Sequence, residues 1–423
     1  MSDKRLYRNA RIASPSHSNL EQADVLVHGT KVEAVSPGLN AAGVALEIDC
    51  EGKILLPALY DVHTHVRGYT EQSLSSISQA AARGGFTGLV LMPDAEPCID
   101  EGSLVFSLLE KAARCPIEIQ VAGRVTRGAD GKALAAIAGM KEAGAVFLTD
   151  GDTAVENPRL LRRAMEYARN FDMFIASHCD TPALSAGGAM NEGVVSYQLG
   201  LPGYPALSEE VAMERDLRLA RYVGARIHLR GVTTRGSIDM IRRAKEEGMN
   251  VTAEVCPHHL IFDENDIGDY DTNFKVNPPL RTEGDREFLL EGVRKGTIDL
   301  IATDHSPHTV YAKLTDFESA PAGMSWLDSA LVALYHHLVK PGKLGWRHLV
   351  STFSEAPRTF LGKPSVRIAP GNTASFIIFD PSGKTRLDAD VIGPNHQNTP
   401  FLHQELDGAI LEVVHEGRVI WKR

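Results

Sequence analysis

Short apolar segments alternate with amphipathic helical segments through the middle of the chain, and this alternation restricts the possible folds most strongly. Examples are GLVLM followed by SLVFSLLEKAAR, AVFLTD followed by PRLLRRAMEYARNF, and RIHLRGV followed by GSIDMIRRAKEEG. A buried strand followed repeatedly by an amphipathic helix predicts βα units and a parallel sheet. Seven or eight such units over roughly 300 residues favour a TIM (β/α)8 barrel. An open doubly wound sheet is the alternative, but no GxGxxG motif follows the first strand, which argues against a nucleotide-binding version.

The two ends of the chain carry a different pattern, in which apolar and polar residues alternate. Near the start this holds for LYRNARI and ADVLVHGTKVEAV, and near the end for ASFIIFDPSG and GAILEVVHEGRVIW. A period of two predicts short strands of a half-buried sheet. We therefore predict an α/β chain in which a barrel at residues 57–365 carries a small composite β-sandwich domain, built from residues 1–56 and 366–423.

Charge and cysteine content exclude several classes of protein. The net charge is −10 and there is no basic run, so nucleic acid is not an expected partner. The five cysteines are far apart and form no CxxC motif, which argues against a disulfide framework or a cysteine zinc site. No signal-peptide core or membrane-length apolar run of about 18 residues occurs. We expect a soluble, cytoplasmic protein.

Metal-type side chains stand where predicted strands end. His63 and His65 follow ILLPALYDV, Asp150 follows AVFLT, His178 follows MFIAS, and Asp304 follows DLIAT. In a barrel these ends meet at one rim, and the two histidines of a His-x-His pair share one face of a strand. Imidazoles with carboxylates suit zinc. Each residue also has an ordinary explanation, since the aspartates could cap helices and His178 could be a buried core histidine.

Several ordered strings resemble the motifs of dihydroorotases, in the amidohydrolase superfamily. They are LYDVHTHVRG, GGFTGLVLMPDAEP, FLTDGD, SHCD, AEVCPHHL, NPPLRTEGDREFLLEG, GTIDLIATDHSPHT and NTPFL. The similarity is to the bacterial branch that bridges two metals with an aspartate, and it extends over nearly the whole chain. It implies a barrel, a composite β domain from both termini, and zinc.

The resemblance also implies roles for the metal-type residues. His63, His65 and Asp304 hold the first metal, Asp150 bridges to the second, and His178 binds the second. Asp304 additionally takes a proton from the nucleophile and delivers it to the leaving nitrogen. This proton transfer suits a carboxylate placed beside a metal ion.

A second set of residues is expected to bind the substrate. By resemblance, Arg67, Asn277 and His308 hold the carboxylate of a small-molecule substrate, and a guanidinium suits that task because it can donate two parallel hydrogen bonds. Asp94 stands where the family has an asparagine that donates to this carboxylate. An ionised aspartate only accepts hydrogen bonds, so it needs a proton, a neighbouring cation or a different ligand there.

Two further departures concern the second metal and the rim. Gly231 stands where the family has the second histidine ligand of the second metal, which leaves that site weakened or empty and one firmly bound zinc ion. His228 lies three residues earlier, and an odd offset places it on the other face of a strand. The loop after Arg67, HVRGYTEQ, replaces the family's usual string and reshapes the rim.

Three functional hypotheses follow. The first is a dihydroorotase, which converts dihydroorotate and water reversibly to N-carbamoyl-L-aspartate in pyrimidine biosynthesis. The second is an amidohydrolase for another cyclic amide or ureide, such as a hydantoin or allantoin. The third is a non-catalytic, dihydroorotase-like partner of aspartate carbamoyltransferase. A homodimer is expected by resemblance, and residues 311–324 could form either a mobile lid or a fixed loop.

Overall fold

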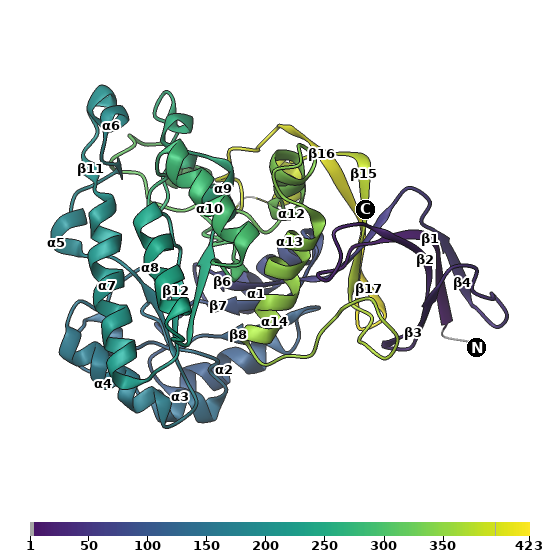
Figure 1. Cartoon of the computed structure of the whole chain (residues 1–423), viewed down its shortest axis with the longest axis horizontal. Coiled ribbons are helices and arrows are strands. Elements are labelled where there is room, and N and C mark those ends of the chain that lie inside the picture. The colour runs from purple at the N-terminus through teal and green to yellow at the C-terminus, as the bar shows by residue number, and fades with distance from the viewer. Residues whose placement is uncertain (1–3, 394) are drawn as a thin grey trace.

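Parallel strands form the core of the larger part of the molecule, with helices around them (Figure 1). The computed structural model describes residues 4–393 and 395–423. One group of paired strands comprises β6 (Leu59–Thr64), β7 (Phe86–Leu91) and β8 (Glu118–Val121). The other comprises β9 (Ile175–His178), β12 (Ile227–Arg230), β13 (Val251–Val255) and β14 (Leu300–Ile301).

Short bridges join the two groups into a closed barrel. Leu148 pairs with Gly123 after β8 and with Ile175 of β9, so a segment too short to count as a strand fills the fourth position. On the other side, Thr64 at the end of β6 pairs in parallel with His305. Three strands, the Leu148 segment and four strands make eight positions among the described residues. The prediction of a TIM barrel is confirmed.

Helices cover the outside of the ring, and several begin at a threonine. Thr70, Thr234 and Thr282 each accept a hydrogen bond from the backbone N–H three residues later, which satisfies an otherwise free donor. The long helices are α1 (Glu71–Arg83), α2 (Gly102–Ala112), α4 (Pro158–Arg169), α7 (Ala206–Val223), α8 (Arg235–Glu246) and α10 (Glu283–Lys295). The short ones are α3 (Ile137–Ala143), α5 (Pro182–Ser185), α6 (Val194–Leu199), α9 (Pro257–Ile261), α11 (Val310–Lys313), α12 (Ala330–Leu334), α13 (Trp346–Val350), α14 (Ala356–Phe360) and α15 (Ala389–Ile392).

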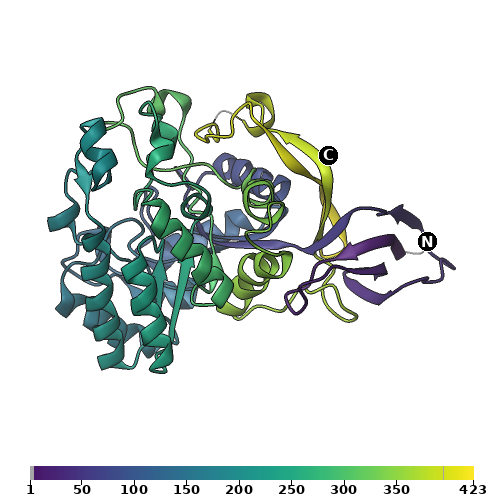
Figure 2. The same cartoon turned by 45° about the horizontal axis from the view of Figure 1, so that its top comes forward.

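Strands from both ends of the chain form a second sheet. Its order is β17-β16-β15-β5-β1-β2-β3, with β4 paired to β1. The strands are β1 (Lys4–Ile12), β2 (Glu21–His28), β3 (Lys31–Ser36), β4 (Leu46–Asp49), β5 (Ile54–Pro57), β15 (Phe376–Arg386), β16 (Glu405–His415) and β17 (Arg418–Lys422). Figures 1 and 2 place β1 to β4 at the end of the molecule away from α4 and α7. The two ends thus build one composite β domain, as predicted.

The composite domain and the barrel share a hydrophobic core. Ile377 and Phe379 of β15 and Ile410 of β16 belong to the same buried cluster as the inner faces of the barrel helices. The contact is close, since a Cβ on Gly85, just before β7, would lie 2.5 Å from the Cδ1 atom of Ile377. The β domain therefore packs directly against the barrel. No helix among the described residues combines the length and apolar character that crossing a membrane requires.

Two polar side chains fix the loops at the rim of the barrel through hydrogen bonds to the backbone. Asn398 accepts from the backbone N–H of His308 at 2.9 Å and donates to the carbonyls of Ser306 and Gly323 at 2.9 and 3.2 Å. Lys313 donates to the carbonyls of Thr272 and Pro321, both at 2.8 Å. The structure therefore shows the segment from 311 to 324 fastened to its neighbours on both sides.

Asp61 is a buried carboxylate that closes the ring between β6 and the segment after β14. It accepts from the backbone N–H of Thr303 at 2.7 Å and from the Thr303 hydroxyl at 2.6 Å, and the Thr64 hydroxyl donates to it as well. Burial raises the pKa of Asp61 to about 6, while these donors oppose the shift. The bonds fix the relative positions of His63 and Asp304, which follow on the two joined segments.

We predict that Asp61→Asn destabilises the protein by about 1–3 kcal/mol, because the amide places a donor against groups that already donate. Urea unfolding followed by circular dichroism measures the change. Asp269→Asn, at an exposed position, is the matched control and is expected to unfold at the wild-type midpoint. Equal midpoints for the two variants would contradict the role given to Asp61.

Candidate metal centre at the barrel rim

Two histidines and two aspartates converge at the end of β6. One donor atom from each of His63, His65, Asp152 and Asp304 lies within 4.8 Å of all the others. The Nε2 atoms of the two histidines are 3.1 Å apart, and Asp304 Oδ1 lies 3.2 Å from each of them. Asp152 Oδ1 lies 3.5 Å from His65 Nε2. The structure thus brings together three residues of the predicted metal set and one that was not predicted.

A carboxylate behind each histidine turns its ring toward the centre. His63 Nδ1 lies 2.5 Å from Glu254 Oε1, and His65 Nδ1 lies 2.6 Å from Asp94 Oδ2. A carboxylate accepts the Nδ1 proton, so in each neutral ring the Nε2 atom carries a lone pair. Such pairing is the usual support of metal-binding histidines. The two lone pairs and Asp304 Oδ1 face one another, which requires a positive charge among them.

The charged groups around His63 and His65 also favour the binding of a cation. Burial works against charging His65, yet Asp94 and Asp152 raise its pKa well above the usual value. Burial likewise opposes ionisation of Glu254, yet His63 and His228 hold its pKa well below the usual range. The centre is therefore a negative, largely buried environment that attracts a cation.

Asp304 occupies an unusual backbone conformation. Its φ is +49°, in the left-handed region that residues other than glycine rarely adopt. Such strain costs of order 1–3 kcal/mol and persists where the surrounding structure enforces it, often at functional sites. Here the neighbouring Thr303 is held by Asp61, and the conformation directs the Asp304 carboxylate to both histidines.

Asp150, the residue expected to bridge two metals, lies outside this four-residue cluster. Its Oδ1 accepts from the backbone N–H groups of Val125 and Thr126 at 2.8 and 3.0 Å, and its Oδ2 accepts from the Thr126 hydroxyl at 2.5 Å. These bonds direct the carboxylate to the neighbouring loop. Gly151, at φ +68°, turns the chain so that Asp152 faces the cluster instead.

The turn depends on glycine at 151, because a Cβ there would lie 3.1 Å from the Cβ of Asp94. The string FLTDGD contains both aspartates, and Asp150 was predicted as the ligand because it directly follows the apolar run. The glycine between them was the available signal for a turn.

The residues expected at a second metal are sparse. His178 is buried, and its Nε2 has no hydrogen-bond partner among the described residues, but it lies outside the four-residue cluster. Gly231 has φ +55°, so the strand ends in a turn there, and a Cβ would meet Pro278 at 3.5 Å. His228 is held by Thr252 and Glu254 at 2.9 and 3.0 Å. Its nitrogens are thus engaged away from the cluster.

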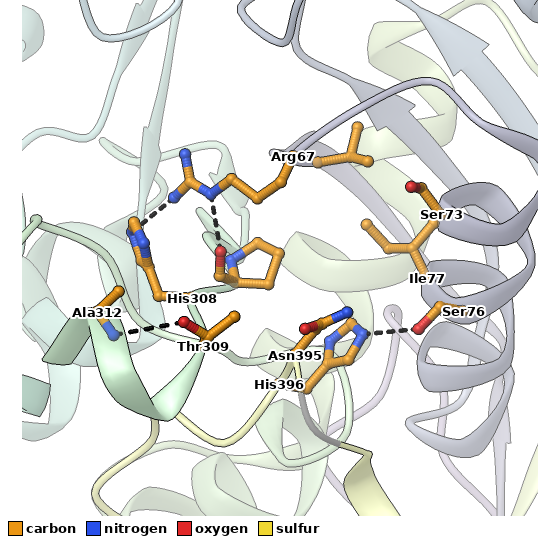
Figure 3. A pocket seen from close by; sticks show the side chains of 11 residues that line it. Arg67, Ser73, Ser76, Ile77, His308, Thr309, Ala312, Asn395 and His396 are labelled. Carbon is orange, nitrogen blue, oxygen red and sulfur yellow. Dashed lines mark hydrogen bonds between the residues drawn. The ribbon is translucent and has the colours of Figure 1, made fainter. Parts of the chain in front are cut away.

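A cavity of about 270 Å³ opens beside the end of β6 and is lined by Arg67 and His308, together with His396 from the C-terminal part of the chain (Figure 3). Arg67 Nη2 lies 2.7 Å from Ser306 Oγ and 2.6 Å from His308 Nε2. Burial and the nearby Arg67 lower the pKa of His308 to about 4, so that ring is neutral.

The other two residues expected to bind substrate lie elsewhere. Asp94 does not line this cavity, because its carboxylate is engaged with His65. Asn277 is half-buried and precedes Pro278, which packs near Gly231. The structure thus places Arg67 and His308 together, and Asp94 and Asn277 apart from them.

Two further residues of the centre were not predicted from the sequence. Glu254 and Arg230 are both buried, and they stand within apolar strings, TAEV and IHLRGV. A charged residue inside an otherwise apolar strand is expensive to bury unless it is paired, and that cost was the signal available for finding them.

Comparison with known proteins relates the chain to one family. A family model described as dihydro-orotase-like matches residues 52–237. The chain is 38% identical to a dihydroorotase from Pelotomaculum thermopropionicum over 99% of this chain and 98% of that protein. It is also 38% identical to a dihydroorotase from Syntrophus aciditrophicus, over 99% of both chains.

Solved structures share the fold at lower identity. The L-hydantoinase (dihydropyrimidinase) from Arthrobacter aurescens has a TM-score of 0.88 and 24% identity, over 100% of this chain and 96% of that one. The dihydropyrimidinase from Brevibacillus agri has a TM-score of 0.82 and 22% identity, over 99% of this chain and 95% of that one.

We predict that Asp152→Asn weakens zinc binding by roughly tenfold or more, because it removes a charged donor from the cluster. Asp150→Asn, two positions away, is the matched control and is expected to bind zinc within about threefold of wild type while losing stability. Competition with a chromophoric chelator measures both affinities. The reverse order of the two variants would contradict the assignment of Asp152.

Proposed function

This chain belongs to the dihydroorotase family of cyclic amidohydrolases, and we propose that it converts dihydroorotate and water reversibly to N-carbamoyl-L-aspartate. The observation that carries the proposal is the convergence of His63 Nε2, His65 Nε2 and Asp304 Oδ1 within 3.1–3.2 Å of one another. In this reaction an amide bond of a cyclic substrate is hydrolysed, and the reverse closes the ring in pyrimidine biosynthesis.

The donor set fits a zinc ion. Nitrogen and oxygen ligands placed about 2.0–2.1 Å from zinc in a tetrahedron stand roughly 3.3 Å apart, close to the separations among these three atoms. Asp152 supplies a fourth donor, at 3.5 Å from His65 Nε2. When bound, such an ion lowers the pKa of water and polarises the amide carbonyl.

Asp304 is placed to move the proton of the reaction. Its carboxylate takes a proton from the attacking water and passes it to the leaving nitrogen, as one carboxylate can do in both steps. His258 lies near its second oxygen without a hydrogen bond between them. The His258 Nδ1 atom accepts from the Trp326 indole N–H at 3.0 Å, so its Nε2 carries the ring proton and lies 3.9 Å from Asp304 Oδ2.

Arg67 and His308 are the residues that we propose for the substrate carboxylate. They line the cavity together with Val66, the residue that follows His65 in the chain, and Arg67 is held there by the carbonyl of Pro307 and the hydroxyl of Ser306, both at 2.7 Å. Asp94 is compatible with this assignment, because its Oδ2 pairs with His65 Nδ1 and Asp94 is not among the residues that line the cavity. The contact with His65 places a potential cation beside Asp94, which is one of the conditions expected for an aspartate at this position.

Several finer expectations stay predictions: zinc as the ion, Asn277 as a substrate ligand, a cytoplasmic location, a homodimer, and assembly with aspartate carbamoyltransferase. The non-catalytic hypothesis has one observation in its favour, the contact of Arg230 with His63 Nε2. The retained carboxylate–histidine pairs support catalysis instead. Another cyclic amide, such as a hydantoin or allantoin, is the alternative substrate.

We expect zinc-loaded protein to turn over dihydroorotate and N-carbamoyl-L-aspartate, and Asp304→Asn to lower kcat by about 10²–10⁴-fold through loss of proton transfer. The rate of hydrolysis is measured from the decrease in absorbance of the ring amide. Asp130→Asn, at an exposed position, is the control. Turnover of hydantoin or allantoin but neither of the first two compounds would replace the proposed substrate, and no turnover of any would favour the non-catalytic hypothesis.

Asp94→Asn separates the two roles considered for that residue. If Asp94 orients His65, the amide weakens zinc binding by about 10–100-fold and leaves the KM at saturating zinc near wild type. Chelator competition and steady-state kinetics measure the two effects. Asp100→Asn is a control, since Asp100 accepts from the Gly128 N–H on the same side of the barrel. A raised KM with unchanged zinc affinity would assign Asp94 to the substrate.

A further inference from the structure

Arg230 places a guanidinium inside the centre. The residue ends β12 and its side chain is only 2% exposed. Its Nη1 donates to the Thr149 hydroxyl at 2.9 Å and to the Gly151 carbonyl at 2.8 Å, and its Nη2 contacts His63 Nε2. These contacts fix the charged group against the turn that delivers Asp152.

The guanidinium is surrounded by carboxylates without forming a close ion pair with any of them. Arg230 lies 3.9 Å from Asp152 Oδ1 and 3.9 Å from Glu254 Oε1. With Asp94 and Asp304, the described residues of the centre supply four carboxylates against this one guanidinium. One divalent cation leaves these five groups with a net charge of −1, whereas a second would make the net charge positive beside the fixed charge of Arg230.

Arg230 also lies on the side of the centre where few residues could bind a second metal ion. It pairs in register with His178 on β9, so the two side chains start from neighbouring strand ends. His178 offers one unpartnered nitrogen there, and the next residue along β12 is Gly231, which offers no side chain. A second ion on this side would have one histidine, a shared Asp152 and a fixed positive charge beside it.

We propose that Arg230 is the built-in second cation of this centre, and that it restricts the protein to a single metal ion. The inference rests on the proposed function, because it assumes a metal at His63, His65 and Asp304. Arg230 is a positioning residue: it neutralises Asp152 and Glu254 and holds the Thr149–Gly151 turn. A second ion attracted to these carboxylates would meet the like charge of Arg230 beside them, and Arg230 Nη2 also contacts His63 Nε2.

Metal content and affinity test the proposal without reference to turnover. Zinc per chain is measured by mass spectrometry after gel filtration, and affinity by chelator competition, in wild type, Arg230→Gln, Arg230→Lys, Gly231→His and the double variant Arg230→Gln/Gly231→His. We expect one zinc in wild type and still one in Gly231→His, because the guanidinium remains in place. The double variant is expected to approach two.

The Arg230 variants alone give a second test, which stands even if histidine at the left-handed position 231 prevents folding. Removing the charge removes like-charge repulsion of the ion, so Arg230→Gln is expected to bind its zinc roughly tenfold more tightly. Arg230→Lys retains the charge and is expected to stay within about threefold of wild type. Thermal unfolding of each variant checks that the chain is folded.

The possible outcomes distinguish a failure of the role proposed for Arg230 from a failure of the proposed function. Two zinc ions in wild type, or two in Gly231→His with Arg230 intact, would overturn the role of Arg230 and leave the proposed function standing. Equal affinities of Arg230→Gln and Arg230→Lys would overturn it as well. A wild-type chain that takes up no zinc at all would contradict the proposed function and the inference with it.

Discussion

Buried hydrogen-bond acceptors that face one another are the constraint on which this centre depends. Glu254 and Asp94 take the Nδ1 protons of His63 and His65, and the two Nε2 atoms then meet the carboxylate of Asp304. Acceptors do not stay together in a buried site unless positive charge lies among them. The barrel holds these acceptors close together because the strand ends that carry them are joined in a closed ring. A cation among the acceptors would stabilise this arrangement.

Much of the architecture could be predicted from the sequence because it follows from burial. Apolar strands and amphipathic helices alternate with a period that any βα barrel must show, and the terminal segments alternate with a period of two. The fourth strand position could not be predicted with the same certainty from this pattern, because Leu148 pairs with its neighbours only through single bridges and forms no extended strand. Its neighbours, which pair over longer stretches, determine where it lies.

The site was predicted in part, and the differences have local causes. His63, His65 and Asp304 stand directly at strand ends, where position along the chain determines position in space. Asp150 also follows an apolar run, but the donors of Thr126 bind its carboxylate, and a turn at Gly151 presents Asp152 instead. The pairing partners of the histidines lie up to 191 residues away along the chain, as for His63 and Glu254. Such partners are found only when the ring is closed.

Asn398 gives the centre an order of assembly. Its amide joins the backbone of Ser306, His308 and Gly323, so it fastens the loop that carries Arg67's neighbours to the rest of the rim. Asn398 follows every strand of the barrel in the chain. During translation the ribosome therefore releases all eight strand positions before the rim can be fastened. A nascent barrel therefore passes through a stage in which its acidic centre exists before Asn398 can join the loops of the rim.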